Sequence, residues 1–430
     1  MPRQNHQTGG YHEAGSSVNA ALDEAALLGT AAPNRLTRAP VRLRVSAMSL
    51  LKIAAVALLL AALPQGAVAF HNAPAVKAGM LRAIDLVLNL DLDAAEVECR
   101  RLLTEPLGEA PGRFCQGLVT LTAAEDKDDP QADLQRFRQQ ADATVAAAQA
   151  LAAAEPTDPD VHLLLGLVYG SKAIADGGEK HYLDAVQDLR EADRRYREAL
   201  RLDPGLADAY YGIGLTRYSL AHLPALLRPF ADMVLPHGDA ALGLQELERV
   251  AEQGTYLKMA ARMALLHFYG GPEKRYAEAL RLGQELLRRY PGNPELYFAT
   301  ANAASELGRF PEAMAVAQAI SRNIAEGRPR FPAEMLPRYN QLLGKLYMDH
   351  GQYAEALTFF DRAVQAPTPK RYRWVTAWAW IRSGMVHDAL GDREEAVRRY
   401  RQTLATQSDG LARELALRYL ESPYRGRSRS

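Results

Sequence analysis

The feature that most constrains the fold of this chain is the stretch from Pro337 to Lys370, which predicts two short antiparallel helices joined by a tight turn. Leu343, Gly344 and Tyr347 share one face of the first predicted helix. Gly351 follows, and glycine tolerates the left-handed backbone that such a turn needs. The stretch therefore predicts a helical hairpin.

The second helix of this hairpin carries a small, a large and a small side chain on one face. Ala356, Phe360 and Ala363 recur at spacings of four and three residues, which places them on the same side of an α-helix. Small side chains on either side of an aromatic ring let a neighbouring helix approach closely. We therefore expect the two helices to pack tightly.

This pattern resembles the tetratricopeptide repeat, a unit of about 34 residues with a Leu-Gly-x-x-Tyr run, an Ala-x-x-x-Phe run and a late proline. The chain departs from it at Asn340, where the family has tryptophan, and at the late proline, which is displaced by one residue to Pro367 or Pro369. The resemblance implies an all-α fold, namely a right-handed superhelical solenoid of antiparallel helix pairs. It also implies a protein that binds proteins or peptides and is not an enzyme.

The repeat pattern continues along most of the chain and weakens toward the N-terminus. Ala95, Cys99 and Leu102 repeat the four-then-three spacing without the full set of family residues, which predicts degenerate repeats there. Residues 171–181 are an insertion that predicts either an exposed loop or a helix extension. The expected organisation is an N-terminal array over 70–222, an irregular apolar connection over 223–255, a C-terminal array over 256–425 and a basic tail over 426–430.

Residues 48–69 have the pattern of a secretory signal peptide. A short start with Lys52 precedes an apolar run from Ile53 to Leu63, and Ala67 and Ala69 supply the small residues of a signal-peptidase site. The run is too short to span a bilayer comfortably, so cleavage after Ala69 is favoured over a retained anchor. We therefore expect an exported, periplasmic protein.

Residues 1–47 are rich in Gly, Ser, Asn, Ala and Arg and lack sustained apolar periodicity. A signal peptide does not normally sit behind such a segment. Our hypothesis is that translation starts at Met48 and that residues 1–47 are a disordered or wrongly assigned extension; a start at Met1 is the alternative.

The chain has two cysteines, Cys99 and Cys115, on successive predicted helices. An oxidising compartment permits a disulfide between them. Two small buried thiols in a helical core are the alternative, and it is the favoured one. No Cys-x-x-Cys spacing is present, which argues against zinc binding or redox chemistry.

The least repeat-like part of the chain is 223–236, where three prolines break any long helix. Its apolar residues are too many for a free loop, so they either fill a gap between the two arrays, which is favoured, or form an exposed patch. An exposed patch gives the alternative function, a membrane-peripheral component of lipid or envelope transport. The residues of this apolar surface are Leu226, Leu227, Phe230 and Met233.

Nothing in the sequence predicts a catalytic site, a metal site or a cofactor. The histidines are scattered singly, and the sequence signatures of zinc proteases, serine hydrolases, P-loops and dinucleotide-binding folds are absent. The chain has 51 basic and 51 acidic residues, and acids interleave with bases in its charged runs, so nucleic acid is not expected as a partner. The oligomeric state stays open.

By resemblance to the family, the functional surface is a groove lined by the first helices of successive repeats. Its residues should lie opposite the packing residues on each first helix. Arg338 and Lys345 could then hold a carboxylate of a bound peptide, although ordinary solvated charges are the favoured reading. The predicted groove residues are Tyr211, Leu215, Tyr218, Phe298, Asn302, Ser305, Arg338, Gln341, Lys345 and Met348. The function that follows is a non-enzymatic scaffold for a protein or peptide in the cell envelope.

Overall fold

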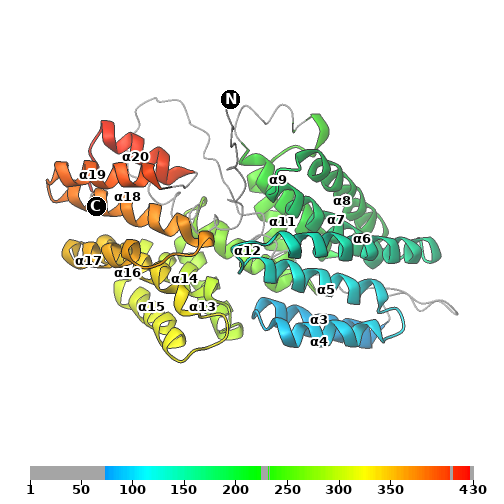
Figure 1. Cartoon of the computed structure of the whole chain (residues 1–430). Coiled ribbons are helices and arrows are strands. Elements are labelled where there is room, and N and C mark those ends of the chain that lie inside the picture. Colours follow the sequence, from blue (N-terminus) through cyan, green and yellow to red (C-terminus); the bar gives the residue numbers. More distant parts are fainter. Residues whose placement is uncertain (1–72, 224–230, 232, 407–409, 427–430) are drawn as a thin grey trace, which may run out of the picture.

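The computed structural model describes residues 73–223, 231, 233–406 and 410–426. The predicted extension, the signal peptide, and Leu226, Leu227 and Phe230 of the apolar segment lie outside these residues. The described chain is built from α-helices joined by short connections, with three 3-10 turns (Figure 1). The all-α fold predicted from the sequence is confirmed.

The helices follow one another as antiparallel neighbours, and consecutive helices pack together along the chain (Figure 1). The pairs are α3 (Pro74–Leu88) with α4 (Leu92–Leu103), α5 (Glu109–Ala124) with α6 (Gln131–Ala154), α7 (Pro159–Gly178) with α8 (Tyr182–Leu202), and α9 (Tyr210–Ala221) with α11 (Ala240–Gln253). They continue as α12 (Lys258–Gly270) with α13 (Tyr276–Arg289), α14 (Pro294–Glu306) with α15 (Phe310–Ala325), α16 (Leu336–His350) with α17 (Tyr353–Gln365), and α18 (Arg373–Ala389) with α19 (Arg393–Ala405). The helix α20 (Leu411–Glu421) packs on the last pair, and the 3-10 turns are η3 (Ala207–Ala209), η4 (Ala333–Met335) and η5 (Lys370–Tyr372).

The hairpin predicted over 337–370 forms as α16 and α17. Gly351 ends α16 with a φ of 83°, the left-handed conformation that glycine adopts without strain. Gly344 packs directly on the ring of Phe360, since a Cβ at Gly344 would lie 2.5 Å from that ring. The same close approach recurs in two other pairs, at Gly166 with Tyr196 and at Gly384 with Tyr400.

The structure decides between the two alternatives for the insertion and revises one expectation, the irregular connection over 223–255. Residues 171–181 belong mostly to α7, which runs to Gly178, so the insertion is a helix extension and not a loop. Residues 240–253 form the regular helix α11, which packs along α9 as the second helix of a pair. Asp239 begins α11 by accepting a hydrogen bond from the amide of Leu242, so the irregular connection is shorter than the predicted 223–255.

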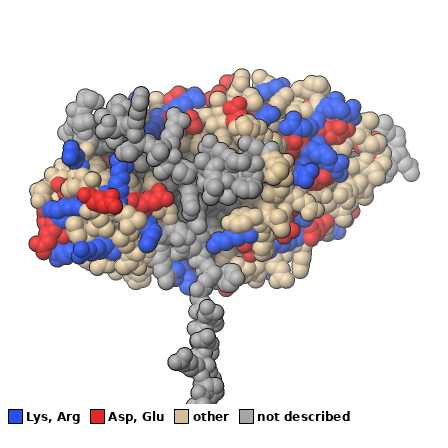
Figure 2. Space-filling view, turned by 90° about the horizontal axis from the view of Figure 1, so that it is seen from above, with Lys and Arg blue, Asp and Glu red and all other residues tan. Residues whose placement is uncertain are grey.

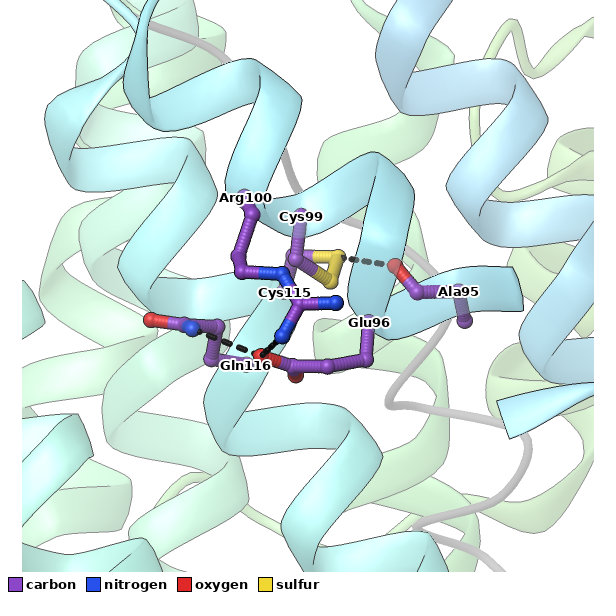
Figure 3. Close-up of a disulfide and its surroundings, with 6 residues drawn as sticks. All are labelled: Ala95, Glu96, Cys99, Arg100, Cys115 and Gln116. Carbon is purple, nitrogen blue, oxygen red and sulfur yellow. Dashed lines mark hydrogen bonds and ion pairs between the residues drawn. A yellow bond between two sulfur atoms is a disulfide. The ribbon is translucent and has the colours of Figure 1, made fainter. Parts of the chain in front are cut away.

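Cys99 and Cys115 form a disulfide between α4 and α5, with their Cα atoms 5.4 Å apart (Figure 3). Both residues are fully buried. Beside the disulfide, the side-chain amide of Gln116 donates to Glu96 across the same two helices, at 2.9 Å. The structure therefore has the bonded arrangement and not the alternative of two free thiols.

Candidate functional site

The first helices of the C-terminal repeats, α12, α14, α16 and α18, pack on one another in order. Six residues of α14 and α16 mark the side on which their polar groups meet, and we call this side the first-helix face. These residues are Glu295, Phe298 and Asn302 on α14 and Arg338, Gln341 and Lys345 on α16. Five of the six were predicted from the sequence as groove residues, and Glu295 was not.

The structure places the predicted groove residues in the interior. All ten are buried except Asn302, which is half-buried. The expectation that they line an open groove is not met, because the first helices of adjacent repeats pack side by side and the basic side chains of α16 pair with acids of α14 and α16. A partner can reach these residues only after a part of the protein moves.

Arg338 is paired across the junction between two repeats. Its Nη1 and Nη2 donate to the two carboxylate oxygens of Glu295, at 2.5 and 2.8 Å. The guanidinium also lies 3.8 Å from the ring centre of Phe298 and 5.5 Å from that of Trp374. Burial alone lowers the pKa of Arg338, but the Glu295 carboxylate outweighs it and raises the pKa above its ordinary value. Arg338 is therefore charged and already neutralised.

Lys345 is held in the same way, about two helical turns further along α16. Its Nζ donates to Glu306 of α14 at 2.8 Å and to Asp349 of α16 at 2.7 Å. Asp349 also accepts from the hydroxyl of Ser305, at 2.7 Å. With Arg338 and Lys345 both engaged by acids of the same chain, the face is close to neutral, and an acidic peptide finds no excess positive charge there.

Three buried polar atoms on this face have no hydrogen-bond partner among the described residues. They are the Oδ1 of Asn302, the Nε2 of Gln341 and the Nε of Arg338. Such an atom costs about 1–3 kcal/mol when it is left unsatisfied. The acceptor is Asn302 Oδ1 on α14, and the donors are the N–H groups of Gln341 and Arg338 on α16. Together they complement a peptide unit, which offers one N–H and one C=O.

The three predicted groove residues on α9 have a different role. The phenol of Tyr218 donates to Glu273 at 2.9 Å, and its ring stacks on Phe268 of α12 with the ring centres 4.0 Å apart. Burial holds the pKa of both Tyr211 and Tyr218 well above the ordinary value, so both phenols stay neutral. These side chains, with Leu215, belong to the core that joins the N-terminal to the C-terminal repeats.

One group of described residues has the composition of a metal site, namely Asp176, Glu179 and His181 at the end of α7. The guanidinium of Arg138 fills the position between them. It donates to Asp176 at 2.7 and 3.0 Å, pairs with Glu179, and lies 3.5 Å from His181 Nδ1. The two carboxylates raise the pKa of Arg138 despite its partial burial, so this group is an ion-pair cluster.

Sequence reasoning missed the acids that neutralise the face, Glu295, Glu306 and Asp349. A signal for two of them was available, because Glu295 and Glu306 precede their basic partners by 43 and 39 residues, about one repeat. When one first helix carries an acid and the next first helix carries a base about one repeat later, the two residues are candidates for an ion pair between repeats.

On the outer surface of the protein, basic and acidic residues are interspersed over the side shown in Figure 2.

Three segments match tetratricopeptide-repeat family models, at residues 273–331, 337–367 and 379–414. The second of these is the hairpin from which the repeat was predicted, and that prediction is confirmed. No curated protein sequence matches the chain.

Among solved structures, similar chains include yeast Tom70, with a TM-score of 0.38 and 12% identity over 80% of this chain and 74% of that chain. Others are the human IFIT1 dimer with PPP-AAAA, with a TM-score of 0.40 and 12% identity over 87% and 84%, and a tetratricopeptide repeat protein from Parabacteroides merdae, with a TM-score of 0.29 and 15% identity over 71% and 98%.

Proposed function

From the tetratricopeptide repeats that the chain contains, we propose that it is a non-enzymatic scaffold that binds an extended protein segment along the first-helix face. Repeat proteins of this kind usually serve as scaffolds for protein partners. The observation that carries the proposal is the set of buried polar atoms on Asn302, Gln341 and Arg338, which complements a peptide backbone. Because the charges of the face are paired internally, the bound segment is neutral or mixed in charge.

Photo-crosslinking tests this proposal. A photoreactive amino acid at Met348, at the edge of the six defining residues, should capture a partner in the native host, and the same residue at Arg113 on α5 is the control. Asn302→Ala with Gln341→Ala should abolish capture from position 348, because the variant loses the two amides and keeps both ion pairs. Unchanged capture by this variant would exclude the face as the binding site.

The place of action in this proposal is the cell envelope, reached by export and cleavage after Ala69. The disulfide between Cys99 and Cys115 supports export, since disulfides persist in oxidising compartments. The sequence pattern of residues 48–69 supports it independently. N-terminal sequencing of the natural protein should give Phe70 as the first residue. A mature chain that keeps residues before Met48 would contradict both the export route and the assigned start.

A second candidate function, contact with a membrane surface, has one observation in its favour. Met233 and Val234, within the apolar segment 223–236, are 75% and 41% exposed. In the described part of the chain, every helix is either too short or too polar for a membrane span. Flotation with liposomes tests surface contact. Met233→Ser with Val234→Ser should abolish flotation, whereas Leu183→Ser, at an 87% exposed leucine on α8, should not.

A further inference from the structure

Polar contacts join the beginning of the described chain to its C-terminal repeats across more than two hundred residues. We call this set of contacts the clasp. On the N-terminal side its residues are Asp85, Leu88, Asn89, Leu90, Asp126 and Asp128, and on the C-terminal side they are Arg289, Tyr290, Gly292, Asn293, Arg330 and Arg371.

The first part of the clasp connects the end of α3 to the connection between α13 and α14. The carboxylate of Asp85 accepts from Arg289 at 2.7 Å and from the phenol of Tyr290 at 2.6 Å. The amide of Gly292 donates to the side-chain oxygen of Asn89 at 2.8 Å. The side chain of Asn293 donates to the carbonyl of Leu88 at 3.0 Å.

The second part connects the turns after α3 and α5 to the next two repeat junctions. Arg330 donates to the carbonyl of Leu90 at 3.0 Å and to Asp126 at 2.7 Å. The backbone amide of Arg371 donates to Asp128 at 3.1 Å, and its guanidinium lies 3.3 Å from the same carboxylate. Although burial raises the pKa of Asp128, these bonds from Arg371 outweigh it and hold the pKa below its ordinary value.

The charges of the clasp are segregated by side. The N-terminal side supplies the acids of its long-range ion pairs, and the C-terminal side supplies the arginines. Each arginine stands just before a first helix, so Arg289 precedes α14, Arg330 precedes α16 and Arg371 precedes α18. The clasp is therefore placed at the N-terminal ends of the helices that form the first-helix face.

The ion pair between Arg289 and Asp85 is exposed to solvent, whereas the bond from Asn293 to Leu88 is buried. Extensive helix packing among the described residues is confined to elements near one another in sequence, so α3 and α13 are joined mainly by side chains of their ends. Arg289 and Asp85 are 52% and 42% exposed. Exposed ion pairs stabilise by about 0–1 kcal/mol each and are screened by salt.

A short chain of contacts links the clasp to the face. Arg371 lies over the ring of Tyr372, with the guanidinium 5.0 Å from the ring centre. Tyr372 in turn lies near Arg338, whose pKa is lowered by burial and raised by Glu295 and Tyr372. Arg338 then holds Glu295. Arg371 and Tyr372 therefore connect the clasp to the surroundings of Arg338.

We infer that the clasp is a reversible closure that opens to admit an extended protein segment to the first-helix face. This inference rests on the proposed binding function, because it explains how residues that are buried in the closed chain become accessible. Opening is controlled by ionic strength and by the three arginines, and it needs no unfolding of a helix pair.

Small-angle X-ray scattering and hydrogen exchange of the full chain measure opening without a partner. Arg289→Asp should increase the radius of gyration and speed exchange of the Gly292 amide severalfold, as should high salt for the native chain. The double variant Asp85→Arg with Arg289→Asp should restore the closed values. Arg309→Asp is the matched control, since Arg309 is 57% exposed and pairs with Glu312 of its own helix. An Arg289→Asp variant that keeps the native radius and exchange rate would overturn the inference, as would equal expansion in the control.

Photo-crosslinking from position 348 then separates the two proposals. Capture should rise severalfold in Arg289→Asp. It should be lost in Asp85→Cys with Arg289→Cys when a short thiol-reactive linker joins the two new thiols. If the chain opens and capture from position 348 is the same in open and locked forms, the clasp is not a gate, and the binding function stands. If the chain opens and no form captures a partner, the proposed binding function fails.

Discussion

Arg338 on α16 and Glu295 on α14 make two hydrogen bonds across the junction of two repeats, and Arg338 is almost completely buried. The pair joins helices that the chain separates by a whole second helix, α15. Its charge balance is therefore a property of two repeats together, and each residue depends on the other for burial.

Removal of the acid should destabilise the protein more than removal of the base. Glu295→Ala leaves a buried guanidinium without its carboxylate and should cost about 3–5 kcal/mol of unfolding free energy. Arg338→Met keeps much of the side-chain volume and leaves a carboxylate nearer to solvent, so its cost should be smaller. Denaturant unfolding monitored by circular dichroism measures both, and equal losses would contradict the assigned burial.

The contact between Gly344 and Phe360 predicts a size-dependent effect. Gly344→Ala introduces a Cβ 2.5 Å from the ring and should destabilise the protein by about 1–3 kcal/mol. Phe360→Leu in the same chain should recover part of the loss. The control is Gly117→Ala on α5, where the new Cβ lies 3.7 Å from Phe137 and helix propensity favours alanine by up to about 1 kcal/mol. Thermal unfolding that ranks the two alanine variants equally would refute the close approach.

The buried carboxyl of Asp160 predicts a pH dependence of stability. Burial, followed by the negative charges of Asp158 and Asp208, raises the pKa of Asp160 from 3.8 to about 7. The folded state then binds a proton that the unfolded state has lost, so this group lowers stability progressively as the pH rises from about 4 to 7, by at most about 1.4 kcal/mol per pH unit. Below that window the cost is absent.

Urea unfolding at a series of pH values between 4 and 8 measures this slope. Asp160→Asn should flatten it, because the amide does not titrate. A slope that Asp160→Asn leaves unchanged would assign the pH dependence to other groups.

The disulfide between Cys99 and Cys115 closes a loop with a sequence separation of 16 residues and should stabilise the N-terminal repeats by about 3 kcal/mol. Thermal unfolding with and without a reducing agent measures its contribution. The double variant Cys99→Ala with Cys115→Ala should unfold at the lower temperature under both conditions. A native chain that is insensitive to reductant would show that the disulfide does not form in solution.

The helix pairs were predictable because they depend on local spacing. Gly344, Gly351 and Phe360 specify a turn and a close approach within one hairpin, and the structure places all three accordingly. The helix α11 was missed because the prolines before it suggested an irregular stretch, while its own signal, the cap at Asp239, is a single residue.

The burial of the first-helix face and the ion pairs within it were not predictable from residue spacing. Spacing identifies the helix side on which Arg338 and Lys345 lie, but their burial depends on acids one repeat earlier and on the angle between repeats. The clasp was beyond sequence reasoning, since the separation of Asp85 from Arg289 in space is set by the accumulated lengths of the intervening helices. An exposed aspartate and an exposed arginine at such a distance in sequence carry no local signal.

The clasp also bears on the order in which the protein assembles. Each helix pair closes a short loop, whereas the contacts between Asp85 and Arg289 and between Asp128 and Arg371 close loops of 204 and 243 residues. The entropic cost of closure grows with loop length, so these contacts form after the pairs that they connect. During synthesis the early repeats can fold as an open row, but the clasp is complete only when Arg371, in the connection before α18, has emerged. A chain shortened before that connection would lack the contact of Arg371 with Asp128 but would keep those of Arg289 and Arg330.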